Sequence, residues 1–146
     1  MRAIRPWLLF WPLLLSWLVA APFASAMAAG SLYDDLGGKS GLSAIVSDTI
    51  DAAVADPRTA DKLDNINIPR LKQRIVEQIC ELTGGPCHFH GISMKGAHAY
   101  LELHDRHFNA LVEDMRNAMD KAGVPFRIQN KLLALLAPMR RDIVTK

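Results

Sequence analysis

The chain has 146 residues, a formal net charge of +2 at pH 7 and 50% hydrophobic residues. This length is enough for a single domain with its own core. Two of the 17 basic residues and none of the 15 acidic residues lie in the first 26, so residues 27–146 hold 15 of each. The basic excess is therefore a property of the leader, and it gives no support for nucleic-acid binding.

Residues 1–26 have the pattern of a cleaved secretory signal peptide. Two arginines precede an uncharged run over residues 7–21, and residues 24–26 have the small-x-small form that signal peptidase accepts. An uncleaved membrane anchor is disfavoured because Pro12 and Pro22 interrupt a run shorter than the span of about 20 residues. We expect a periplasmic or secreted protein with no stable membrane insertion after cleavage.

The next two elements are expected to be helices. Residues 31–34 (Ser-Leu-Tyr-Asp) match a capping box, and Gly37-Gly38 ends this short helix. A second helix is predicted up to Asp56-Pro57. Its buried face consists of Leu42, Ile45, Val46, Thr49, Ile50 and Ala53.

From Arg58 to Ile68 the periodicity fades, and we expect a short turn or loop with one or two inward apolar anchors, for which Leu63 and Ile66 are the candidates. Pro69 suits the first turn of a third helix, where its missing N–H costs nothing. That helix ends at Gly84-Gly85. Its apolar stripe is Leu71, Ile75, Ile79 and Leu82.

Three helical segments are expected after the glycine pair. A short one places Met94, Ala97, His98 and Leu101 on one face. Asp105 is the expected cap of a long helix that ends at Gly123. The buried face of this helix is predicted to be Phe108, Leu111, Val112, Met115 and Met119.

The final helix is expected to run from Ile128 to Ile143 with a kink at Pro138. A connection of about three residues makes it an antiparallel neighbour of the preceding long helix. No strand alternation is evident in the sequence. The predicted fold class is all-α, with one domain over residues 31–146.

Five histidines lie between residues 88 and 107. None of His88, His90, His104 and His107 lies four residues from His98, so a helical zinc pair is a weak hypothesis. Taken alone, His98 among apolar neighbours is more often a core histidine than a metal ligand.

Cys80 and Cys87 flank the glycine turn, and in an oxidising compartment they could form a disulfide. Two free thiols are an equally good interpretation, because pairing demands a specific Cα separation.

The chain from Ser31 to Lys146 resembles group I truncated haemoglobins. The resemblance rests on the order and spacing of segments 32–38, 56–58, 83–86, 94–99 and 107–115. It implies a two-over-two helical sandwich around haem b, with iron held by His98 as the proximal ligand. It also implies a haem-binding globin that takes a diatomic gas: oxygen, nitric oxide or carbon monoxide.

The resemblance further implies which side chains surround the haem. The apolar wall would consist of Leu63, Leu71, Ile75, Met94, Leu101 and Phe108, with Arg74 near a propionate. Thr49 and Ile50 would face the gas at positions where the family commonly has Phe-Tyr. Because the phenol donor is absent, we expect fast oxygen release, ready autoxidation and retained carbon monoxide binding.

Two alternatives to a gas-binding haem protein stay open. One is an enzyme that detoxifies nitric oxide or peroxide, which would need an electron source such as an unidentified reductase. The other is a haem-free globin fold that serves as an interaction module. The sequence indicates no catalytic residues.

Overall fold

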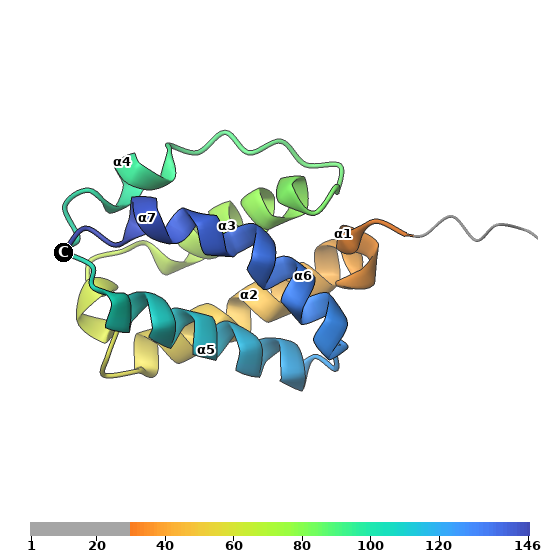
Figure 1. Ribbon diagram of the computed structural model, residues 1–146, viewed down its shortest axis with the longest axis horizontal. Coiled ribbons are helices and arrows are strands. Elements are labelled where there is room, and N and C mark those ends of the chain that lie inside the picture. Colours follow the sequence, from red (N-terminus) through yellow and green to blue (C-terminus); the bar gives the residue numbers. More distant parts are fainter. Residues whose placement is uncertain (1–29) are drawn as a thin grey trace, which may run out of the picture.

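The computed structural model describes residues 30–146, and every regular element in that range is a helix (Figure 1). The all-α prediction is thus confirmed for this part of the chain, whereas the predicted signal peptide lies outside it. The elements are α1 (Leu32–Asp35), α2 (Gly38–Ala55), the 3-10 turn η1 (Ala60–Lys62), α3 (Ile68–Leu82), α4 (Met94–His98), α5 (Asp105–Lys121), α6 (Phe126–Leu136), the 3-10 turn η2 (Ala137–Met139) and α7 (Arg140–Ile143).

Helix α2 is the centre of the fold. It packs extensively on both α3 and α5, and its buried residues are those that the sequence predicted. Helix α5 has a smaller contact with α6, so the expected pairing of the last two helices is only a minor part of the packing. No helix among the described residues is both long and apolar enough to cross a membrane.

Two helix boundaries differ from the sequence prediction. Helix α5 has His104 rather than Asp105 at its N-cap, and Asp105 is the first helical residue. The expected helix over residues 128–143 divides into α6, η2 and α7, and Pro138 lies within η2. Proline cannot donate the helical hydrogen bond and its ring clashes with the preceding turn, which explains the break.

In the loop before α3, one of the two candidate anchors is inward: Leu63 is half-buried, whereas Ile66 is 38% exposed. Two other positions that were expected to be inward are exposed. Leu82 is 37% exposed at the last residue of α3. Ala97 is also exposed, although Met94, His98 and Leu101 on the same face are half-buried. Residues at the end of an element have neighbours on fewer sides, so a periodic sequence pattern overstates their burial.

One of the five histidines, His107, has a structural role at the start of α5. The backbone N–H of His104 donates to Nδ1 of His107 at 2.9 Å, and the His107 ring is buried. Burial, aided by the charges of Arg106 and Lys62, lowers the pKa of His107. The neutral ring keeps the lone pair that this bond needs, so His107 has a capping role.

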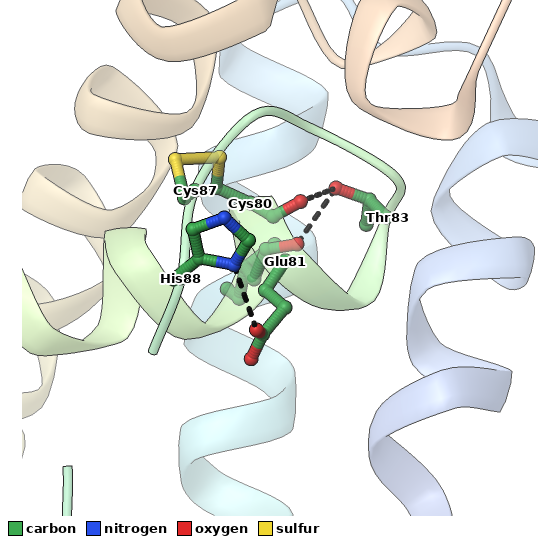
Figure 2. The surroundings of a disulfide bond; sticks show 6 residues. Cys80, Glu81, Thr83, Cys87 and His88 are labelled. Atoms are coloured by element: carbon green, nitrogen blue, oxygen red, sulfur yellow. Dashed lines mark hydrogen bonds and ion pairs between the residues drawn. A yellow bond between two sulfur atoms is a disulfide. The ribbon is translucent and has the colours of Figure 1, made fainter. Parts of the chain in front are cut away.

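A disulfide joins Cys80, in the last turn of α3, to Cys87 beyond the glycine turn (Figure 2). Gly84 adopts a left-handed backbone with φ of +83°. A Cβ at Gly85 would lie 2.6 Å from the Cys80 sulfur and 2.6 Å from the Tyr33 ring. The turn therefore needs glycine at both positions, and it brings together the two cysteines whose pairing the sequence left open.

Replacing Cys80 and Cys87 together by alanine is expected to lower the free energy of unfolding by about 2.5 kcal/mol, the chain-entropy value for so short a loop. Chemical denaturation of both proteins measures the difference. Adding a reductant to the native protein is the matched control, because it breaks the bridge and leaves the core intact. An unfolding midpoint of the native protein that is the same with and without the reductant would contradict the prediction.

Asp114 is a buried carboxylate on α5. It is 8% exposed, and its Oδ2 has no hydrogen-bond partner among the described residues. Burial raises the pKa of Asp114, the nearby charge of Asp56 adds to the rise, and Arg58 opposes it. Folding therefore favours the protonated carboxyl, so its contribution to stability is full at acid pH and is lost as the pH rises through the raised pKa.

Asp114→Asn is expected to raise the melting temperature at neutral pH, because it removes a buried charge while keeping the side-chain shape. The gain over the native protein should shrink as the pH falls through the raised pKa of the Asp114 carboxyl, because the protonated carboxyl is uncharged like the amide. Thermal denaturation across this pH range tests the prediction. A difference that grows on acidification would have the wrong sign.

Candidate functional site

His98 ends the five-residue helix α4. The hydroxyl of Ser93 accepts a bond from the Gly96 N–H and so starts this helix after the irregular segment. His98 is half-buried, and its Nδ1 lies 2.8 Å from the carbonyl oxygen of Met94. A carbonyl can only accept, so Nδ1–H is the donor, and in the neutral imidazole Nε2 then keeps its lone pair. His98 thus presents a metal-binding nitrogen of fixed tautomer.

The role of the Met94 carbonyl was not part of the sequence prediction. The sequence feature that could have indicated it is the separation of four residues between Met94 and His98. In a helical turn this separation places the Met94 carbonyl near the His98 ring.

The residues expected to face the gas lie on α2 and α3. Thr49 and Ile50 are 1% and 2% exposed, and the Thr49 hydroxyl donates to the Ile45 carbonyl at 2.7 Å. Leu71 and Ile75 on α3 are half-buried against the core cluster that contains Ile50. The only hydroxyl among these four side chains is therefore used by its own helix.

The other expected wall residues come from separate parts of the chain. Leu63 caps η1, Met94 opens α4, Leu101 follows α4, and Phe108 lies in the first turns of α5. All four are half-buried, and none belongs to the side chains packed against the core cluster. Apolar side chains with this much accessible surface can gain contacts with a flat apolar group such as haem.

Arg74 lies on α3, one residue before Ile75. Its Nη1 is 2.8 Å from Oε2 of Glu77, and its side chain is 40% exposed. An ion pair this exposed stabilises the fold by less than about 1 kcal/mol, so it can exchange with another anion at little cost.

The His98 imidazole and the apolar surface of the expected wall residues suit haem, which needs one neutral nitrogen and a wall that excludes water. The zinc hypothesis has no such support. Between residues 30 and 146, no group of three or more His, Cys, Asp or Glu side chains could hold a metal ion. His88 and His90 are exposed, and their only ion-pair partner within the described residues is Glu81, whose Oε1 lies 3.8 Å from Nδ1 of His88 (Figure 2).

An open hollow of about 500 Å³ lies elsewhere, between the α1–α2 corner and the turn from α5 to α6. Its lining is mostly small residues such as Gly37, Gly41 and Ala44. None of the expected site residues lines it, so it is separate from the His98 region.

Comparison with known proteins identifies similar domains. Residues 31–145 match the family described as bacterial-like globin. The group 1 truncated hemoglobin GlbN of Mycolicibacterium paratuberculosis is 30% identical over 127 residues, which cover 87% of this chain and 93% of that protein. A group 1 truncated hemoglobin of Tetrahymena pyriformis is 26% identical and covers 80% of this chain and 96% of its own length.

Solved structures give the same result. The truncated hemoglobin of Tetrahymena pyriformis in its Fe(III) form superimposes with a TM-score of 0.76 at 26% identity, covering 80% of this chain and all of that one. The 2/2 hemoglobin of Synechococcus sp. PCC 7002, described in the cyanomet state with covalently attached heme, has a TM-score of 0.75 at 25% identity and the same coverage. The similarity therefore extends over a whole domain.

Proposed function

Because this chain belongs to the bacterial-like globin family, and is a haem-binding globin that takes a diatomic gas, we propose that Nε2 of His98 is the proximal ligand of its haem iron. The observation that carries this proposal is the bond from Nδ1 of His98 to the Met94 carbonyl. Such a partner fixes the tautomer of a ligating histidine and the direction of its ring. With His98 as its ligand, haem iron would supply the site at which the diatomic gas binds.

The rest of the proposed site acts by excluding water and by its lack of donors. Leu63, Leu71, Ile75, Met94, Leu101 and Phe108 offer apolar surface. The Thr49 hydroxyl donates to its own helix, so it offers no free donor to the gas, and Nη1 of Arg74 pairs with Glu77. We propose that Arg74 moves to a haem propionate, to which a guanidinium can donate two bonds.

The absorption spectrum of the purified protein with one equivalent of haem tests this proposal. We expect a Soret band, carbon monoxide binding to the reduced protein, and a resonance Raman iron–histidine stretching band in the reduced, ligand-free state. A Soret band without the iron–histidine band would leave haem binding in place and overturn the assignment of a histidine ligand.

We also propose that the protein is exported. The leader pattern of residues 1–26 supports this, and so does the disulfide, since such bonds persist mainly in oxidising compartments.

The test of export uses tryptophan. Trp7, Trp11 and Trp17 are the only tryptophans, and all lie in the leader. We expect the protein purified from the periplasm or medium to lack tryptophan fluorescence and to have the mass of residues 27–146. A tryptophan emission band from that fraction would show that the leader is retained.

A further inference from the structure

Leu103 lies five residues after His98 and is held by the last residues of the sequence. The N–H groups of Thr145 and Lys146 both donate to the Leu103 carbonyl, at 2.9 and 3.1 Å. The Leu103 N–H in turn donates to the hydroxyl oxygen of Thr145 at 3.1 Å. Both backbone polar groups of Leu103 are thus bonded to the segment 145–146, and the Leu103 side chain is buried.

The connection from His98 to Leu103 is short and constrained. The Leu101 N–H donates to the His98 carbonyl at 3.1 Å. Glu102 follows with a φ of +48°, the only positive φ among non-glycine residues of the described chain. Residues other than glycine adopt this conformation rarely, and it persists only where the surroundings enforce it. The bonds to Leu103 are next to this position and supply that restraint.

Three further contacts join the same regions, and one of them is the ion pair of Lys146 with Glu102 at 3.2 Å. Helix α7 packs against α4, and the end of the chain reaches the link between α4 and α5 (Figure 1). Arg140, at the start of α7, forms an ion pair with Asp105, at the start of α5. The segment 140–146 therefore contacts α4, the residues that follow it and the beginning of α5.

We propose that Thr145 is a positioning residue for His98. Its hydroxyl and backbone N–H fix Leu103, Leu103 fixes the left-handed turn at Glu102, and this turn holds the end of α4 that carries the imidazole. The proposal rests on the proposed function, since it concerns the direction of a histidine that binds iron. Sequence periodicity could not reveal it, because the bonded residues are 42 positions apart.

The test is Thr145→Val in the haem-loaded full protein. Valine keeps the side-chain shape and the backbone donor but removes the acceptor for the Leu103 N–H. We expect haem transfer to excess apomyoglobin to become roughly two- to tenfold faster, the range for one lost hydrogen bond. The iron–histidine band of the reduced protein should broaden or shift. Thr145→Ser, which restores the acceptor, should return both values to normal.

A second variant that ends at Val144 removes the two backbone donors as well, and it should produce the larger effect. Ser40→Ala is the matched control, because it deletes an exposed hydroxyl that bonds the Gly37 carbonyl at 3.3 Å at the start of α2. This control should change neither haem loss nor the iron–histidine band.

Amide hydrogen exchange at Leu103 separates a local structural bond from a positioning role. Faster exchange in Thr145→Val, with unchanged haem loss and an unchanged band, would overturn the proposal. An iron–histidine band that is missing already in the native protein would instead refute the assignment of His98, so the two failures are distinguishable.

Discussion

Replacing His98 by alanine is expected to weaken haem binding by more than about 100-fold and to abolish the iron–histidine band. Loss of a partner that merely orients a ligand already costs 10- to 100-fold in metal affinity, so loss of the ligand itself should exceed that. The fold should persist because His98 is half-buried and α4 contains no buried residue. Added imidazole should restore a histidine-like spectrum, since it supplies the same nitrogen.

His90→Ala is the matched control, because this exposed histidine lies in the segment before α4. It should leave the spectrum and haem affinity unchanged. Circular dichroism of both variants checks the helical content. An unchanged reduced spectrum in His98→Ala, or a lost band in His90→Ala, would contradict the proposed ligand.

Ile50→Tyr is expected to slow oxygen dissociation by roughly ten- to a hundredfold. Oxygen gains partial negative charge as a haem ligand, and a charge-assisted hydrogen bond contributes about 1.5 to 3 kcal/mol. The proposed gas site lacks this donor, since Ile50 is apolar and the Thr49 hydroxyl bonds the Ile45 carbonyl. Carbon monoxide dissociation should change much less, because that ligand carries little charge.

Ile50→Phe is the matched control, because it adds the same ring without the hydroxyl. Ile50 is 2% exposed, so both rings overpack the core and should cost about 1 to 3 kcal/mol of stability. Stopped-flow oxygen release separates the two effects. If phenylalanine slows release as much as tyrosine does, crowding rather than a missing donor controls the rate.

Helix positions could be predicted from the sequence wherever a local rule decides them. Asp56-Pro57 ends α2, and Pro69 occupies the first turn of α3 as its missing N–H predicts. The sequence misplaced the α5 cap, because His104 takes that position through a bond to the ring of His107. It also missed the division of the last helix, since a kink and a break at Pro138 have the same sequence signature.

The candidate site was less accessible to sequence reasoning. His98 shares its type with four other histidines, and only the resemblance to a family distinguished it. The bond to the Met94 carbonyl, which gives His98 a free Nε2, depends on the ring orientation in α4. Periodicity records which face a residue occupies, but it carries no information about where a side-chain donor is directed.

The disulfide also sets how far α4 can move from α3. With Cys87 bonded to Cys80, only residues 88–93 connect the bridged unit to α4, whereas without the bond residues 83–93 form the connection. The local concentration of one end of a flexible linker near the other falls as about the −3/2 power of its length. Reduction would therefore lower the local concentration of a detached α4 near α3 by roughly 2.5-fold. The redox state of the surroundings thus determines the length of the chain segment that tethers α4 to α3.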